Sequence, residues 1–344
     1  MADEQRWQAA ACTGARTKDM KMQQRKLGSS GLTTAPLVLG GNVFGWTIDA
    51  PTSFDVLDAF VDHGFNAIDT ADVYSAWVPG NKGGESETII GKWLKARPGM
   101  REKVTLFTKV GSQMGPADAV PPHKGLSARW ITTAVEDSLK RLGIETIDLY
   151  FSHWPDPDTP YEETLRAYEG LLQAGKVRAI GASNLDADQL GESLRVAKAH
   201  GLPSYQVLQP GYNLYDRTPF EGALADLCQS EGIGVVVYYA LASGFLSGKY
   251  RSEADLDKSK RGGGVKKYLT PRGLRILDAL DAVASAHGAS SAEIALAWLM
   301  AQPAVTAPIA SATSTAQIAS FARAAALTLT ADQLAALGDA SRPE

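Results

Sequence analysis

Short apolar segments alternate with longer amphipathic segments along most of this chain. The short segments have the length of buried strands, and 234–239 is apolar throughout, as expected for a strand covered on both faces. The longer segments repeat apolar residues every three or four positions, which is typical of helices with one buried face. We predict strands at 36–39, 66–71, 104–110, 146–153, 177–183, 205–209, 234–239 and 305–311, and helices at 53–63, 85–95, 127–143, 160–174, 186–200, 220–231, 271–286, 291–300, 314–325 and 331–337.

The segment 127–143 has the clearest helical pattern. Ser127 can cap its first turn with a side-chain oxygen, and Gly143 can end it. The apolar face between these two signals is formed by Ile131, Val135, Leu139 and Leu142.

Strand and helix alternate about eight times without a Pro- or Ser-rich linker, which favours βαβ units with a parallel sheet. An open, doubly wound sheet is the alternative, but its Gly-x-Gly-x-x-Gly turn does not occur. Residues 244–249 also lack the spacing and the final Ser or Thr of a P-loop. The predicted fold class is therefore α/β, a closed (β/α)8 TIM barrel in a single domain over 22–344. We expect 1–21 to be a poorly ordered extension.

Two further segments lie outside the repeating pattern. Residues 24–33 are typical of a short β-hairpin, which can plug the bottom of the barrel. The long loop 242–270 follows the seventh barrel strand and carries three consecutive glycines at 262–264 and several cations. It is either a solvated, mobile loop or a flap over a phosphate-bearing ligand, since long loops in compact domains are often functional. Its cations include Lys258, Lys260, Arg261, Lys266 and Lys267.

The composition narrows the class of protein. Of the 344 residues, 44% are hydrophobic and 21% charged, which indicates a globular chain. The net charge of −4 favours neither nucleic acid nor a membrane surface as a partner. The two cysteines, Cys12 and Cys228, form no Cys-x-x-Cys pair, so we expect no disulfide scaffold and no metal site. With no signal peptide or spanning segment apparent, we predict a cytoplasmic protein that acts on a small molecule; the oligomeric state stays open.

Three successive strands deliver a titratable side chain at or just past their C-terminal ends. Asp69 and Lys109 lie near the ends of the second and third strands, and His153 ends the fourth. Tyr74 comes five residues after Asp69, in a predicted loop. Because these strand ends open on one face of a parallel barrel, where barrel enzymes carry their chemistry, we predict that the four residues form one catalytic site.

These residue types suit the transfer of a proton to a carbonyl oxygen. A free phenol has a pKa near ~10, so it is a weak acid at neutral pH. We expect the ammonium group of Lys109 to lower the pKa of Tyr74, while Asp69 keeps Lys109 charged. His153 is expected to donate a second hydrogen bond to the substrate oxygen.

The sequence resembles the aldo-keto reductase superfamily over 24–337. The resemblance rests on several motifs in the family's order: Asp69-Thr70-Ala71-Asp72-Val73-Tyr74, Gly84-Glu85-Ser86-Glu87 continuing to Gly91, Thr108-Lys109, Asp148 to His153, Gly181-Ala182-Ser183-Asn184, Gln209-Pro210 and Tyr212-Asn213-Leu214. This family resemblance implies an oxidoreductase that interconverts a carbonyl compound and its alcohol, with a nicotinamide cofactor and Tyr74 as general acid or base.

The resemblance also implies a set of cofactor contacts. Ser183, Asn184 and Gln209 would bind the nicotinamide carboxamide, and Tyr238 would stack on its ring. The pyrophosphate would lie near Leu241, Ser243, Gly244 and Lys249, and the adenosine near Ser311 and Gln317. Ser320 and Phe321 stand where the family usually has Glu-Asn, and no arginine marks a 2′-phosphate. NADP(H) is favoured over NAD(H) by family habit, and cations of the loop 242–270 can substitute for that arginine.

Loops at the C-terminal face build the substrate pocket in such barrels. Trp46 is the first candidate for an aromatic wall, followed by Trp77 and Trp154, and such walls suit a bulky or ring-shaped carbonyl compound.

Two alternatives to this enzyme stay open. One is a nicotinamide-binding regulatory subunit with vestigial catalysis, and the other is a barrel lyase or isomerase without a cofactor.

Overall fold

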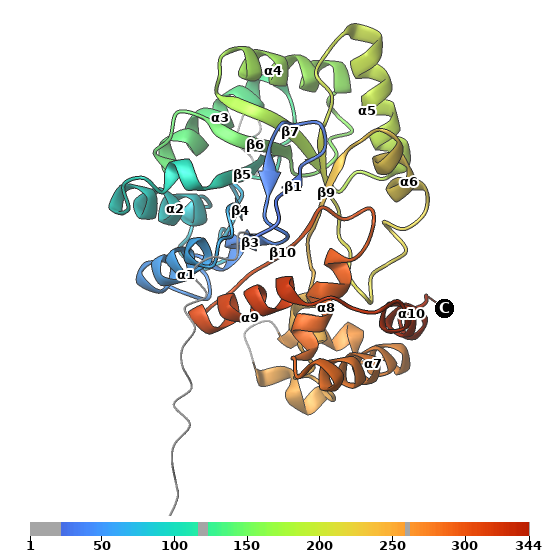
Figure 1. The fold of residues 1–344 in the computed structure, drawn as a ribbon. Coiled ribbons are helices and arrows are strands. Elements are labelled where there is room, and N and C mark those ends of the chain that lie inside the picture. The colour runs from blue at the N-terminus through green and yellow to red at the C-terminus, as the bar shows by residue number, and fades with distance from the viewer. Residues whose placement is uncertain (1–21, 116–122, 259–261, 344) are drawn as a thin grey trace, which may run out of the picture.

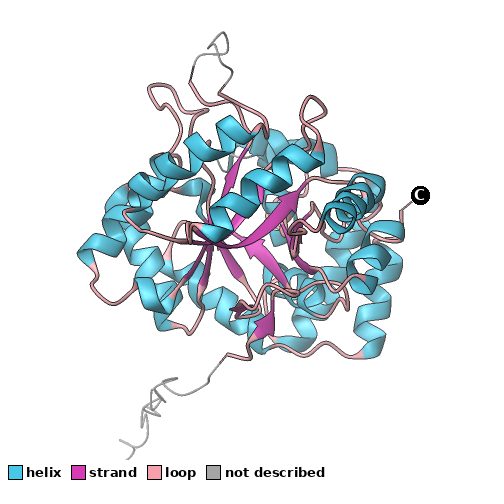
Figure 2. Cartoon of the chain, turned by 90° about the horizontal axis from the view of Figure 1, so that it is seen from above, coloured by secondary structure: helices cyan, strands magenta, loops and turns pink. Residues whose placement is uncertain are grey.

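A closed barrel of eight parallel strands forms the centre of the protein, and helices surround it (Figures 1 and 2). The computed structural model describes residues 22–115, 123–258 and 262–343. Neighbouring strands follow one another in sequence, and the last pairs with the first. The closed-barrel prediction is therefore confirmed. The strands are β3 (Val38–Gly40), β4 (Ala67–Asp69), β5 (Thr105–Val110), β6 (Ile147–Ser152), β7 (Val177–Ser183), β8 (Val207–Gln209), β9 (Gly234–Val237) and β10 (Ala307–Ala310).

The helices lie close to their predicted positions. Ser127 accepts a hydrogen bond from the backbone N–H of Trp130 at the start of α3, and Gly143 ends that helix in a left-handed conformation, as predicted. The helices are α1 (Ala50–Asp62), α2 (Glu85–Ala96), α3 (Ala128–Leu142), α4 (Tyr161–Gln173), α5 (Ala187–His200), α6 (Ala223–Ser230), α7 (Pro271–His287), α8 (Ser291–Met300), α9 (Thr315–Ala326) and α10 (Ala331–Ala340), with a short 3-10 turn η2 (Arg101–Lys103) before β5. In the described part of the chain, no helix is long and apolar enough to cross a bilayer.

The predicted hairpin closes the N-terminal end of the barrel. Strands β1 (Arg25–Lys26) and β2 (Thr33–Thr34) pair antiparallel, and β1 lies across the barrel in Figure 1. Leu27 and Leu32 are buried with the side chains that fill the barrel interior. A Cβ atom at Gly28 would lie 2.3 Å from the carbonyl oxygen of Gln206, just before β8, so the hairpin fits only with glycine there. With this end plugged, the other end is left for a site.

The long loop after β9 is more ordered than a solvated segment. Its described parts form three short 3-10 helices, η3 (Ala242–Ser247), η4 (Glu253–Lys258) and η5 (Gly262–Tyr268). Phe245 and Tyr268 are buried and stack with ring centroids 5.4 Å apart. The described loop is therefore anchored by its own apolar residues. Lys260 and Arg261, and the expected extension 1–21, lie outside the described residues.

Candidate active site

The C-terminal end of the barrel opens into a cavity of about 900 Å³. Asp69 ends β4 and His153 follows β6, and both line this cavity together with Tyr74. Lys109, on β5, lies directly behind Asp69 and is fully buried. The four predicted catalytic residues therefore lie together, as their positions at strand ends indicated.

Lys109 and Asp69 form a buried ion pair. The Nζ atom of Lys109 lies 2.7 Å from both carboxylate oxygens of Asp69 and 2.7 Å from the carbonyl oxygen of Thr70. Burial lowers the pKa of Lys109, and the charge of Asp69 opposes that change. An isolated ammonium group would not stay charged in such a place, so the carboxylate keeps this one charged.

Tyr74 completes this buried group. Lys109 donates a hydrogen bond of 3.0 Å to the Tyr74 hydroxyl, which in turn donates to Asp69 Oδ2 at 3.4 Å. The turn that brings the phenol here is held by Ser75, which has a left-handed backbone (φ 74°) and donates from its buried hydroxyl to the carbonyl oxygen of Phe44. Sequence reasoning missed Ser75, because nothing in its local pattern distinguishes it from an ordinary loop serine.

The expectation that Lys109 lowers the pKa of Tyr74 is wrong in direction. Burial, followed by the charge of Asp69, raises the pKa of Tyr74 well above 10. The physical reason is the ion pair itself, because Asp69 neutralises Lys109 and leaves the phenol beside a nearly neutral pair in a dry cavity. Tyr74 is thus held protonated, in the form that a general acid needs.

His153 is neutral in this environment. Its side chain is buried, and burial together with the charge of Lys109 lowers its pKa well below 6.5. Its backbone N–H donates to the carbonyl oxygen of Val110, and its own carbonyl oxygen accepts from Asn184 Nδ2 at 2.9 Å. A neutral imidazole can act as a hydrogen-bond donor without bringing a second charge beside Lys109.

These pKa directions predict how activity depends on pH. Since the pKa of His153 lies well below 6.5 and that of Tyr74 well above 10, neither group changes protonation in between. Lys109, whose pKa is lowered from 10.5, is the first of the three to change protonation on the alkaline side, where it loses its proton and its charge. We expect kcat/KM for carbonyl reduction to show no acid limb near pH 6.5 and to fall only at alkaline pH. An acid limb there that vanishes in His153→Gln would contradict this assignment.

A second charged network supports β5 from behind. Glu87 is fully buried on α2, accepts a hydrogen bond from Thr108 next to Lys109, and pairs with Arg141 at 2.6 Å. Nearby Asp72 is also buried, and burial, followed by the charge of Glu87, raises its pKa. The sequence analysis quoted Glu87 only as part of a motif, since no local pattern shows that a helix residue contacts a strand 21 positions later.

The predicted nicotinamide contacts form one connected cluster. Gln209 Nε2 donates to Asp69 Oδ1 at 2.9 Å, and Ser183 Oγ donates to the carbonyl oxygen of Gln209. The Tyr238 hydroxyl donates to Asn184 Oδ1 at 2.6 Å. Asn184 has a left-handed backbone (φ 62°), an unusual conformation that turns its amide into this cluster.

The far end of the cavity suits an anion. Ala242, Ser243 and Gly244 have successive positive φ values of 47°, 58° and 97°, a run of the kind in which backbone amides form anion-binding concavities. The Lys249 Nζ atom would lie 3.8 Å from a Cβ atom at Gly244. A dinucleotide has an aromatic ring, an amide and a pyrophosphate, and the residues predicted to contact each of them lie along this cavity. All the predicted cofactor contacts line the cavity: Ser183, Asn184, Gln209, Tyr238, Leu241, Ser243, Gly244, Lys249, Ser311 and Gln317.

The aromatic wall differs from the first choice made from sequence. Trp77 and Trp154 line the cavity mouth, whereas Trp46 is not among its lining residues and packs edge-on against Trp77 at 5.4 Å between ring centroids. Tyr239, which the sequence analysis did not select, also lines the mouth and is 58% exposed. Trp46 was favoured because it follows the first strand, but the side chain of Trp77 is the one in front of Tyr74.

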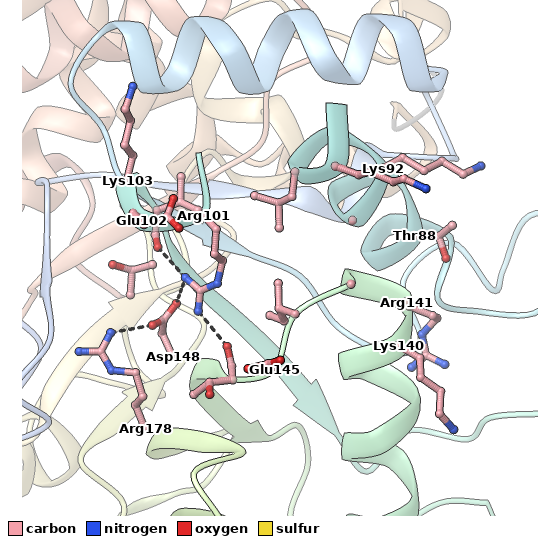
Figure 3. Close-up of a pocket in the computed structure, with 18 of the residues that line it drawn as sticks. Thr88, Lys92, Arg101, Glu102, Lys103, Lys140, Arg141, Glu145, Asp148 and Arg178 are labelled. Carbon is pink, nitrogen blue, oxygen red and sulfur yellow. Dashed lines mark hydrogen bonds and ion pairs between the residues drawn. The ribbon is translucent and has the colours of Figure 1, made fainter. Parts of the chain in front are cut away.

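A second cavity, of about 970 Å³, lies at the N-terminal ends of β5 to β7 (Figure 3). Asp148 pairs there with Arg101 at 2.9 Å and with Arg178 at 2.8 Å. Lys95 and Lys140 lie in the last turns of α2 and α3, where cations offset the helix dipoles. This hollow holds none of the predicted site residues, and its central charges brace the strands. Among the described residues, no cluster of His, Cys, Asp and Glu could hold a metal ion.

The chain is similar to known proteins over nearly its whole length. The sequence model described as "Aldo/keto reductase family" matches residues 36–342. An uncharacterised oxidoreductase of Bacillus subtilis, YrpG, is 34% identical over 92% of this chain and 95% of its own. The aldo-keto reductase YhdN of the same organism is 35% identical over 77% and 76%. A probable voltage-gated potassium channel subunit beta of Arabidopsis thaliana is 33% identical over 86% and 89%.

Proposed function

This chain belongs to the aldo/keto reductase family, and from that premise we propose that it is an NAD(P)H-dependent reductase of carbonyl compounds. The observation that carries the proposal is the Tyr74 hydroxyl, 3.0 Å from Lys109 Nζ and open to the cavity. A bound nicotinamide would supply or accept the hydride. The residues of this chain orient the carbonyl compound and move the proton.

The proposed division of roles follows from the geometry. Tyr74 gives its hydroxyl proton to the oxygen of the substrate during reduction and takes it back during oxidation. His153 donates a second hydrogen bond to the same oxygen, which stabilises developing negative charge. Lys109 compensates the charge left on the phenol oxygen, because its Nζ atom already donates there. Donors fixed in advance in a water-poor cavity need little reorganisation during the reaction.

NADP(H) is the proposed cofactor in preference to NAD(H). This preference rests on the habit of the aldo/keto reductase family, because Lys249 lines the cavity where the pyrophosphate common to both dinucleotides would lie. Arg323, near the adenosine end, is already paired with Glu293 at 2.6 Å, and Ser320 donates to the same carboxylate. Fluorescence titration with NADPH and NADH tests the proposal. Failure to bind either dinucleotide would favour a lyase or isomerase that needs no cofactor.

A bulky or ring-bearing carbonyl compound is the proposed substrate. Trp77 and Trp154 are 48% and 49% exposed, and both line the cavity, where exposed aromatic side chains suit the binding of a ring. Steady-state rates with a panel of aldehydes, ketones, sugars and alcohols, followed at the nicotinamide absorbance, test the reaction.

The free, buried thiol of Cys228 agrees with the proposed cytoplasmic location.

Trp77→Ala should raise KM for an aromatic aldehyde by about 10-fold, since a lost ring contact of about 1.5 kcal/mol has that effect. KM for a short aliphatic aldehyde should change little. Leu274→Ala is the matched control, because Leu274 is also an exposed large apolar side chain but does not line the cavity. Equal changes in KM for both aldehydes would count against Trp77 as a wall for rings.

A regulatory subunit is the second candidate, because relatives at 33–34% identity are named as probable potassium channel subunits beta. All four catalytic groups are present in this chain, and three of them are joined by hydrogen bonds, which supports the enzyme. The two functions differ in turnover. A single slow turnover without a steady-state rate across the carbonyl panel would support the regulatory subunit.

A further inference from the structure

The two ring nitrogens of His153 have different surroundings. The Nδ1 atom lies 3.1 Å from the hydroxyl oxygen of Ser112, and the ring lines the cavity together with Ser112. Trp154 stacks on the ring, with centroids 5.6 Å apart and planes 17° from parallel. Packing therefore sets the plane of the imidazole, but packing alone does not decide which nitrogen carries the proton.

The position of that proton decides what His153 can do. A neutral imidazole has one N–H group, and the other nitrogen is only an acceptor. With the proton on Nε2, the ring can donate a hydrogen bond to an oxygen in the cavity. With the proton on Nδ1, the ring would present a lone pair to the same oxygen and repel it. The neighbour of Nδ1 therefore controls whether His153 can assist a carbonyl group.

Ser112 is placed to be that neighbour by the end of β5. The chain passes from Val110 through Gly111, whose φ of 123° is strained for other residues, and this turn directs Ser112 toward β6. A Cβ atom at Gly111 would also approach Leu126 to 3.3 Å. Within the described part of the chain, the Ser112 hydroxyl makes one side-chain hydrogen bond, to Nδ1 of His153.

We propose that the Ser112 hydroxyl donates its proton to Nδ1 of His153 and so holds the ring in the Nε2–H form. Ser112 is then a positioning residue, since it acts through His153. Its effect on turnover rests on the proposed reductase function, whereas its effect on the imidazole does not.

The direct test is ¹⁵N NMR of the histidine rings in the intact protein. Long-range ¹H–¹⁵N correlations distinguish Nδ1–H from Nε2–H, and His153→Gln identifies the His153 signals among the five histidines. We expect the Nε2–H form in the wild type and a mixture of both forms in Ser112→Ala. Ser112→Thr keeps the hydroxyl and should restore the Nε2–H form. A Nδ1–H ring in the wild type, or an Nε2–H ring unchanged in Ser112→Ala, would overturn the proposal.

Kinetics give the second readout. Ser112→Ala should lower kcat by about 10-fold, because one hydrogen bond of ordinary net strength can favour the Nε2–H form over the Nδ1–H form by about that ratio. Ser112→Thr should restore the wild-type kcat. The Kd for NADPH should stay near the wild-type value in both variants, which also confirms folding. A protein that shows the NMR change but reduces no carbonyl compound would refute the proposed function alone. Turnover that is equal in all three proteins would refute the role of Ser112.

Discussion

Tyr74→Phe should lower kcat for carbonyl reduction by about 1,000-fold, within the range expected when a general acid is removed. The Kd for NADPH should stay near the wild-type value. The substitution removes the hydroxyl group and keeps the ring, which contacts His153 and Trp77 edge-on. We expect the Lys109–Asp69 ion pair to persist, because Lys109 Nζ contacts both carboxylate oxygens of Asp69 directly, at 2.7 Å. The loss should therefore appear in proton transfer and not in folding.

Stopped-flow measurement of NADPH consumption, with a parallel cofactor titration, checks this expectation. Tyr239→Phe is the matched control, because Tyr239 also lines the cavity mouth and keeps its ring in the variant. Its kcat should remain close to that of the wild type. A Tyr74→Phe protein that retained wild-type turnover would show that another group delivers the proton.

Lys109→Met should damage both activity and stability. The variant leaves the carboxylate of Asp69 buried without its cation, and breaking a buried pair in this way costs about 3–5 kcal/mol of unfolding free energy. It also removes the charge that compensates the Tyr74 oxygen, so kcat should fall by at least about 100-fold. Denaturant unfolding and steady-state rates measure the two effects separately.

The double variant Asp69→Asn/Lys109→Met separates the two effects of the lysine. With both charges removed, no ion is left uncompensated, so part of the lost stability should return. Activity should not return, since the cation beside Tyr74 is still missing. If the double variant recovered turnover together with stability, Lys109 would be a structural residue and no more.

The barrel and the grouping of the four proposed catalytic side chains were predictable because they depend on local patterns. Apolar strands, amphipathic helices and their end signals determine where each strand stops, as Ser127 and Gly143 illustrate at the two ends of α3. In a parallel barrel the strand ends share one face. The positions of Asp69, Lys109 and His153 in sequence were therefore enough to place them together.

Other features depend on contacts between distant segments, and no local pattern shows these. The contact of Glu87 with Thr108 and Arg141 joins two helices and a strand. The pKa of Tyr74 was misjudged for a related reason. The sequence shows that a cation and an acid are near the phenol, but not that they pair at 2.7 Å and so cancel each other. The choice of Trp46 over Trp77 failed because loop conformation, and not order along the chain, decides which ring faces the cavity.

The central claim is that this cavity transfers a hydride between a nicotinamide and a ring-bearing carbonyl compound, with Tyr74 moving the proton. The most direct measurement is reduction of an aromatic aldehyde with NADPH deuterated at both C4 positions, followed by mass spectrometry of the alcohol. We predict one deuterium at the carbinol carbon in the product of the wild type, and no measurable product from Tyr74→Phe in the same time. An alcohol without deuterium, or no alcohol from any carbonyl compound despite bound NADPH, would contradict the claim.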